Sequence, residues 1–223
     1  MRILRFVCFV AAPIACLQSV SGQSFVNLDF ENTTFTRFLV NSYTGYYATN
    51  ATVPGWDWLP HQTFGNGDPN TTVAFNNLAL SAAAVDLEGT NFFAPYSAIQ
   101  GNYSIYLQGA SYNGGGGALI GQTGQIPANA ESITYWGGNF QVSFNGQLLS
   151  FNDISNALTY GVWQADISAY AGQIGELLFT CAERNGGMLD NIQFSSLPIP
   201  EPGIFGMFGL GALCFLRYRK NHS

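Results

Sequence analysis

The chain has 223 residues, of which only 9% are charged, and its formal net charge is −6. Soluble domains average about 25% charged residues. A protein that follows nucleic-acid phosphates needs clustered Lys and Arg, so a chain with seven basic residues is not expected to bind nucleic acid. A helical bundle is excluded as well, because such chains are rich in Glu, Lys, Leu and Ala. The 29 Tyr and Phe residues, separated by Gly and Asn, predict an all-β fold.

The basic residues are concentrated at the two ends of the chain. Five of the seven lie in the first five or the last seven positions, and the stretch from Gln23 to Leu197 keeps only Arg37 and Arg184. Twelve acidic residues in this stretch give it a formal charge of −10. Such a surface repels anionic partners and suits an exported protein.

The N-terminus has the order of features typical of a secretory signal peptide. Two arginines precede an apolar run from Phe6 to Leu17, and small residues follow up to Gly22. We predict that residues 1–22 are a signal peptide and that Gln23 becomes the mature N-terminus. A lipoprotein cysteine at Cys16 is the alternative, but the residues just before it fit that pattern poorly.

The C-terminus combines a proline-rich motif, a short apolar segment and a basic tail, in that order. Pro200, Glu201 and Pro202 cannot continue a helix or a central strand, because proline fixes φ and lacks the backbone donor. Ile204 to Leu216 is apolar or Gly throughout, and as a helix it spans roughly 20 Å of a hydrocarbon core about 30 Å thick. We predict a short transmembrane helix with a cytoplasmic tail that contains Arg217, Arg219 and Lys220.

This ordered triple resembles the PEP-CTERM sorting signal of exported bacterial proteins, and it covers residues 198–223. In that family the tail is a substrate of exosortase, a membrane protease-transferase. The resemblance implies a protein that is anchored in the membrane before processing and is then held at the cell surface or released. The helix departs from the family pattern because it is short, interrupted by Gly and contains Cys214. An ordinary stop-transfer anchor is the alternative. A glycolipid-anchor signal is disfavoured, since such tails end apolar.

The body between the two ends reads as a series of short strands. Residues alternate between apolar and polar from Tyr103 to Gln108 and from Asn139 to Phe144, and Asn145-Gly146 is a strong hairpin signal. Further strands are predicted at Phe25–Phe30, Thr71–Leu80, Ala118–Gln122, Ser132–Trp136, Gly161–Ile167, Glu176–Cys181 and Met188–Phe194. Many short strands without a helix predict a sandwich or a barrel, and we expect a β-sandwich over residues 23–197. Its single cysteine, Cys181, is expected to be a buried small hydrophobe.

Short motifs across the body resemble the galactose-binding-like jelly-roll domains. They are Asn27–Glu31, Val53–Trp56, Gly101–Gln108 and Leu189–Phe194. The resemblance implies that the first and last strands lie close together and that a structural Ca²⁺ is held there. It also implies three calcium ligands, which are Asp29, Glu31 and Asp190.

The residues themselves give Asp190 a separate reason to need a partner. Period-2 alternation places it on the same face as Ile192 and Phe194, so its carboxylate begins an apolar face. A hard cation would satisfy that carboxylate. The alternative is that Asp190 and Asn191 close turns after the preceding glycines.

The sequence contains no recognisable catalytic arrangement. There is no Gly-x-Ser-x-Gly, and the body has no His and Cys cluster for zinc. Paired carboxylates for glycoside hydrolysis can be drawn from the acids, but any body with twelve acids offers such pairs. The acids that could form such pairs are Asp57, Asp86, Glu88 and Glu131. Asp86 and Glu88 fall on one face of a strand, and a solvent-exposed strand edge would show the same pattern.

The composition fits carbohydrate binding better, because sugars are commonly held by aromatic faces with polar groups at the rim. Trp56 and Trp58 are candidate ligand-binding residues in a stretch predicted to be a loop, which also contains Tyr43, Tyr46 and Tyr47. A core position is the alternative for Trp56. We therefore expect a non-catalytic envelope or extracellular-matrix protein associated with exopolysaccharide. A carbohydrate-active enzyme, either a glycoside hydrolase or a lyase, is the alternative.

Overall fold

The computed structural model describes residues 22–33, 37–41, 44–48, 53–59, 72–76, 82–155 and 160–199. These ranges form fourteen strands and one short 3-10 helix, η1 (Ser168–Tyr170). No helix within them is long and apolar enough to cross a bilayer. The predicted signal peptide up to residue 21 and the predicted sorting tail from residue 200 onward lie outside the described residues.

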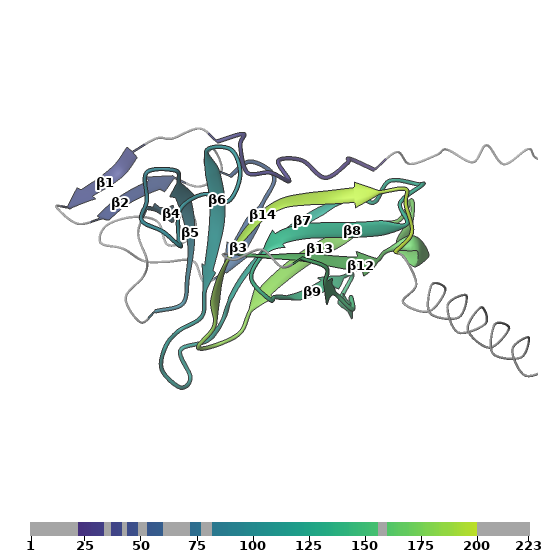
Figure 1. Cartoon of the computed structure of the whole chain (residues 1–223). Helices are drawn as coiled ribbons and strands as arrows, with labels where there is room; N and C mark the ends of the chain where they lie inside the picture. Colours follow the sequence, from purple (N-terminus) through teal and green to yellow (C-terminus); the bar gives the residue numbers. More distant parts are fainter. Residues whose placement is uncertain are drawn as a thin grey trace, which may run out of the picture.

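The strands form two sheets, so the body is an all-β sandwich as the sequence predicted (Figure 1). All strand pairs are antiparallel except β4 with β5. The nine-stranded sheet has the order β1 (Arg37–Asn41), β2 (Thr44–Ala48), β4 (Thr72–Phe75), β5 (Ala84–Gly89), β6 (Tyr103–Gln108), β14 (Gly186–Ser195), β8 (Ser132–Gly137), β12 (Gly161–Asp166) and β11 (Asn152–Asp153). The five-stranded sheet has the order β10 (Gln147–Leu148), β9 (Gln141–Phe144), β13 (Ile174–Cys181), β7 (Ala118–Gln125) and β3 (Asp57–Leu59).

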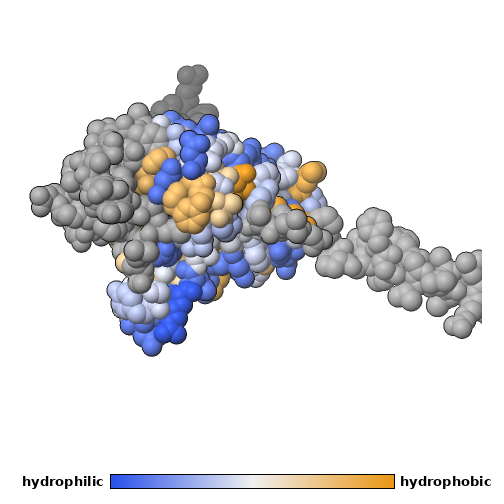
Figure 2. All heavy atoms as spheres, turned by 60° about the vertical axis from the view of Figure 1, so that its left-hand side comes forward, coloured by the Kyte–Doolittle hydropathy of each residue, from blue (hydrophilic) through white to orange (hydrophobic). Residues whose placement is uncertain are grey.

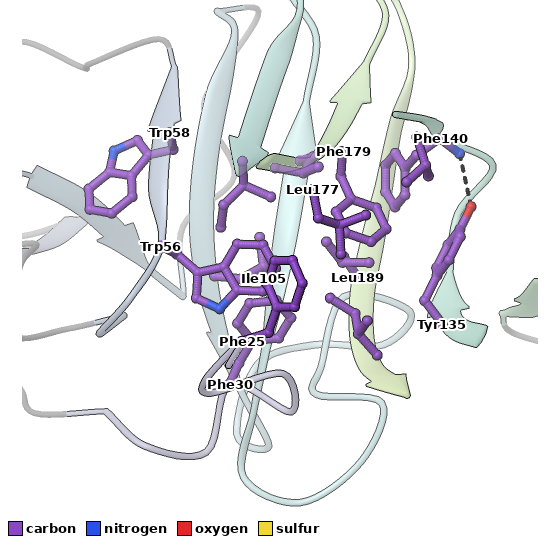
Figure 3. Close-up of a cluster of buried hydrophobic side chains, with 14 of the residues drawn as sticks. Phe25, Phe30, Trp56, Trp58, Ile105, Tyr135, Phe140, Leu177, Phe179 and Leu189 are labelled. Carbon is purple, nitrogen blue, oxygen red and sulfur yellow. Dashed lines mark hydrogen bonds between the residues drawn. The ribbon is translucent and has the colours of Figure 1, made fainter. Parts of the chain in front are cut away.

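The core lies between the two sheets and contains side chains from both of them (Figure 3). Ile105 and Leu189 come from the nine-stranded sheet, whereas Leu177 and Phe179 come from the five-stranded sheet, and all four are fully buried. Burial of each such side chain stabilises the fold by about 1.5–3 kcal/mol. In the coloured part of the face that Figure 2 presents, hydrophilic side chains surround a hydrophobic cluster near the centre of the view.

Most of the strands expected from alternation are present. The Asn145-Gly146 hairpin is confirmed, since both residues have positive φ (49° and 76°) and connect β9 to β10. The structure also has strands where the sequence predicts them, with bounds that differ by a few residues. These strands are β4, β6, β7, β8, β12, β13 and β14. Cys181 is buried as expected.

Two stretches differ from the sequence prediction. Phe25–Phe30 is not a strand, because Asn27 (φ 51°) and Phe30 (φ 56°) adopt the left-handed conformation and break the extended backbone. The stretch predicted to be a loop contains strands β2 and β3. β2 pairs with β1, which directly precedes it in the chain, and with the more distant β4, and the Gly- and Thr-rich sequence shows no clear alternation that would indicate these pairings.

The first and last segments of the body lie side by side, as the jelly-roll resemblance implied. The backbone N–H of Ile192 in β14 donates to the carbonyl of Leu28 at 2.9 Å. The rings of Phe25 and Phe194 stack with their centroids 5.5 Å apart. The galactose-binding-like assignment itself stays a prediction.

Candidate functional site

The nine-stranded sheet has one face toward the core and one face away from it, which we call the outer face. Ile105 and Leu107 of β6 belong to the core, so alternation places Ser104 and Tyr106 on the outer face. The same reasoning applies to β5, in which Val85 and Leu87 belong to the core and the acidic residues between and after them face outward.

A β-bulge directs Asp190 to this outer face. The register of β14 against β8 shifts between Asp190 and Gln193, and Asn191 has a φ of 48°. Leu189 and Ile192 therefore both reach the core, although strict alternation would separate them. The prediction that Asp190 shares a face with Ile192 and Phe194 is wrong, because the bulge inserts a residue that a period of two does not count.

Asp190 is fully buried and its carboxylate accepts three hydrogen bonds. The donors are the Ser104 hydroxyl at 2.7 Å, the backbone N–H of Gln100 at 3.0 Å and that of Asn191 at 2.6 Å. Burial raises the pKa of Asp190 to about 6, and the nearby Glu31 carboxylate adds to this increase, while the three donors oppose it. The site thus holds two carboxylates close enough to repel each other.

The three predicted calcium ligands are only partly brought together. Glu31 accepts the backbone N–H groups of Asn102 (2.7 Å) and Tyr103 (2.9 Å), so it contacts the same 100–104 segment as Asp190. Asp29 is exposed, and its Oδ1 accepts the Glu31 N–H at 3.4 Å. No group of three or more metal-binding side chains occurs among the described residues. Two mutually repelling carboxylates fit a cation, but backbone oxygens would have to complete its shell.

Two further carboxylates lie on the outer face in β5. Asp86 and Glu88 are both fully buried, so the expectation that they form a solvated edge is wrong although they do share one face. Neither oxygen of Asp86 has a hydrogen-bond partner among the residues that the structure describes. Burial raises the pKa of Asp86 well above its usual value. Asp86 lies directly opposite Tyr106 in the β5–β6 register.

A cavity of about 280 Å³ opens beside Tyr106 on the same face. Its aromatic walls are Tyr96, Tyr106 and Tyr160, and the rings of Tyr96 and Tyr106 meet edge to face with centroids 5.4 Å apart. Tyr160 stacks on Trp136 at 5.5 Å. The volume is close to the lower end of the range of about 300–1,000 Å³ typical of small-molecule sites. We call this cavity the tyrosine pocket.

The floor of the tyrosine pocket consists of glycines from two neighbouring strands. Gly137 ends β8 and Gly138 follows it, and Gly186 and Gly187 begin β14. A Cβ on Gly186 would overlap the Tyr106 hydroxyl, and a Cβ on Gly187 would approach Gly138 Cα to 2.9 Å. Gly186 therefore keeps space free beside the Tyr106 wall, whereas Gly187 lets β14 pass close to the Gly138 backbone and the core ring of Phe140.

The two tryptophans predicted to contact a ligand both belong to the buried core (Figure 3), and Trp56 also lines a groove on the five-stranded sheet. Trp56 is 5% exposed, its Nε1 donates to the Asn27 carbonyl at 2.9 Å, and its ring lies 5.3 Å from that of Phe30. Trp58 is 3% exposed. Both rings are large enough that burial against the sandwich interior outweighs exposure on a loop.

The residues of the tyrosine pocket were not singled out from the sequence. Tyr96 lies in the segment between β5 and β6, and Tyr160 precedes β12, so they meet only in the fold. The available signal was the pair of Gly-Gly dipeptides at 137–138 and 186–187. Glycine inside a strand pattern often marks the close approach of a ligand or another backbone.

Comparison with known proteins identifies the C-terminus. Residues 198–220 match the PEP-CTERM protein-sorting motif. The chain carries a PEP-CTERM sorting signal. The matched range includes every residue assigned to sorting from the sequence, namely Pro200, Glu201, Pro202, Arg217, Arg219 and Lys220. The chain is therefore an exported protein that is anchored in the membrane, processed by an exosortase and displayed at the cell surface.

No curated protein matches the chain. Among solved structures, it is similar to the Stig cyclase Fisc from Fischerella sp. TAU in complex with an indole compound, at 16% identity and a TM-score of 0.48. That match covers 82% of this chain and 100% of the cyclase. A cyclase from Fischerella sp. in its apo form is 15% identical with a TM-score of 0.42, and the match covers 81% of this chain and 98% of that one.

Proposed function

We propose that this exported protein is a non-catalytic carbohydrate-binding protein of the cell surface or its polysaccharide matrix, and that its ligand occupies the tyrosine pocket. The observation that carries the proposal is the combination of three tyrosine walls with a glycine floor. Aromatic faces pack against the apolar faces of a sugar ring, and the tyrosine hydroxyls and exposed backbone supply the polar contacts. A cavity of about 280 Å³ suits a small unit such as one sugar residue.

The position of the pocket along β14 supports this assignment. Gly186 and Gly187 begin β14 beside the pocket, and Ser195 ends it next to the segment that leads into the sorting signal (Figure 1). At about 3.3 Å per residue, the strand separates the two by roughly 30 Å. A membrane anchor at the C-terminal end would therefore leave the pocket on the far side of the sandwich, where a matrix polymer has access to it.

The lining of the tyrosine pocket supports binding over hydrolysis. Glycoside hydrolysis uses two carboxyl groups that flank the scissile bond. No carboxylate lines the pocket among the described residues, and Asp86, Glu88 and Asp190 on the same face are fully buried.

One observation favours the enzymatic alternative at a different place. A groove of about 350 Å³ on the five-stranded sheet is lined by Asp57 and Glu176, which are both exposed. Asp57 lies opposite Gly121 in β7, and Glu176 reaches over the same glycine, since a Cβ there would lie 3.5 Å from its Oε1. Two accessible carboxylates around one groove are the minimum that a glycosidase requires.

A glycan array followed by a hydrolysis screen tests the two functions on the chain from Gln23 to Ile199. This chain contains the whole described core. Binding without turnover supports the proposal. Turnover that is abolished by Asp57→Asn or Glu176→Gln supports the enzymatic alternative and contradicts the proposal. Absence of both binding and turnover also contradicts it.

A further inference from the structure

An exposed aromatic surface continues from the tyrosine pocket onto the segment between β5 and β6. The ring of Tyr96, a wall of the pocket, meets the ring of Phe93 edge to face with centroids 5.4 Å apart. Phe93 is 57% exposed, and its ring centroid lies 4.5 Å from that of Phe92. Pro95, which lies between Phe93 and Tyr96 in the chain, is exposed and also lines the pocket. This surface connects Phe93 to the tyrosine pocket.

The backbone holds Phe93 in its exposed position. The N–H of Phe92 donates to the carbonyl of Gly89 at 3.1 Å, and the N–H of Tyr96 donates to the carbonyl of Phe93 at 2.9 Å. The far end of the segment is bonded to the buried carboxylate of Asp190. A ring that is already fixed loses less conformational entropy when a ligand packs on it than a mobile ring does.

The surroundings of Phe93 indicate the chemistry of a ligand. Single exposed apolar side chains are common, but Phe93 contacts two further rings beside a cavity, and contiguous apolar surface of this kind marks binding grooves. Residues 90–103 contain no charged side chain. Thr90 and Asn91, which precede the two phenylalanines, are exposed. Aromatic faces flanked by hydroxyl and amide groups suit a neutral sugar, which has an apolar ring face and hydroxyl groups at its edge.

We propose that the site binds a glycan chain of at least two sugar residues, with one residue in the tyrosine pocket and the next one stacked on the ring of Phe93. This inference rests on the proposed function and extends the same site by a specificity-determining residue. The pocket of about 280 Å³ suits a single sugar unit, so a longer chain has to leave it, and the surface over Pro95 leads to an aromatic face. A monosaccharide in the pocket does not reach Phe93, whereas the second residue of a chain does.

The test compares the affinities of the mature protein for the terminal monosaccharide and the terminal disaccharide of the best array glycan. NMR titration measures both, because it follows weak binding as well as strong binding. We expect the disaccharide to bind at least about fivefold more tightly than the monosaccharide, as one additional aromatic contact provides. We call this ratio the disaccharide gain.

Three variants assign the gain to one ring. Phe93→Ala should reduce the disaccharide gain below about twofold and leave the affinity for the monosaccharide unchanged. Phe93→Tyr keeps a flat ring at the same position and should retain the gain. Tyr112→Ala is the matched control, since Tyr112 is 55% exposed on a loop outside the pocket, and it should change neither affinity. Melting temperatures show that each variant is folded.

Two results overturn the inference and leave the proposed function intact. One is equal affinity of the wild-type protein for monosaccharide and disaccharide. The other is a disaccharide gain that persists in Phe93→Ala; if sedimentation then shows a wild-type dimer that this variant dissociates, the ring serves self-association instead. Loss of monosaccharide binding in folded Phe93→Ala also overturns the inference, because Phe93 would then act on the pocket itself. A negative glycan array contradicts the proposed function, and the inference fails with it.

Discussion

The hydroxyl of Ser104 lies 2.7 Å from the carboxylate of Asp190, and this hydrogen bond joins β6 to β14 at the β-bulge of the last strand. The same hydroxyl accepts the backbone N–H of Ile99 at 2.8 Å, and Asp190 accepts that of Gln100. The two side chains therefore fix the end of the segment that carries Tyr96. These hydrogen bonds therefore help to position Tyr96, which forms one wall of the tyrosine pocket.

Replacing Ser104 with Ala should destabilise the protein by about 1–3 kcal/mol, because the Ile99 N–H loses its acceptor and Asp190 loses a donor. Urea unfolding of the mature protein measures the difference. Ser111→Ala is the matched control, since Ser111 is exposed and its loss should change stability by less than about 0.5 kcal/mol. Equal stability of the two variants would show that the Ser104–Asp190 pair does not hold this segment.

Stability should decrease as the pH rises from 5 toward 7. The folded-state pKa of Asp190, about 6, and that of Asp86 are above the usual value, so their stabilising contribution is complete below the unfolded pKa and is lost as the pH passes the folded pKa. Two units for Asp190 correspond to about 3 kcal/mol in all, of which about half is lost between pH 5 and pH 7. Thermal melts in chelator, compared with those of Asp190→Asn, measure the effect. A wild-type melting temperature that rises between pH 5 and pH 7 would contradict it.

Calcium should raise the melting temperature relative to chelator, because Glu31 and Asp190 lie against one segment and repel each other. A ligand that binds only the native state adds about 2.7 kcal/mol at a hundredfold excess over its dissociation constant. Glu31→Gln should abolish the response. Identical melting of metal-free wild type with and without calcium would remove the calcium hypothesis.

Alternation predicted the sandwich because strands such as β13 bury one face and expose the other, and the Asn145-Gly146 turn fixes one hairpin locally. β5 and β6 are buried on both faces, which apolar–polar alternation alone does not indicate. The pattern failed where the backbone leaves the regular geometry. The bulge at Asn191 and the left-handed residues near Phe30 depend on contacts with distant strands, which a local period does not contain.

The candidate site was harder to predict than the fold. Tyr96, Tyr106 and Tyr160 come from three separate segments, and nothing in their spacing brings them together. The tryptophans attracted attention because large aromatic residues often mark binding sites, but the same size makes them good core residues. The sorting signal was predictable because its three features are contiguous, and their order carries the information.

Processing at both ends is expected in the native host. Intact-mass analysis should give a chain that begins near Gln23 and ends close to Pro200–Pro202, with or without an added anchor mass. It should lack residues 217–223, because the basic tail follows the segment that the exosortase removes. Recovery of the complete C-terminus in the mature envelope fraction would instead make the tail a permanent anchor.

The central claim is that the tyrosine pocket is the carbohydrate-binding site, and the affinity of tyrosine variants for the best array glycan tests it most directly. Tyr160 lines the pocket, whereas Tyr112 is 55% exposed on a loop outside it. We expect Tyr160→Ala to weaken binding at least about tenfold, equivalent to about 1.4 kcal/mol, and Tyr112→Ala to leave the affinity unchanged. Unchanged affinity for Tyr160→Ala, with the fold intact, would place the binding site elsewhere and contradict the account.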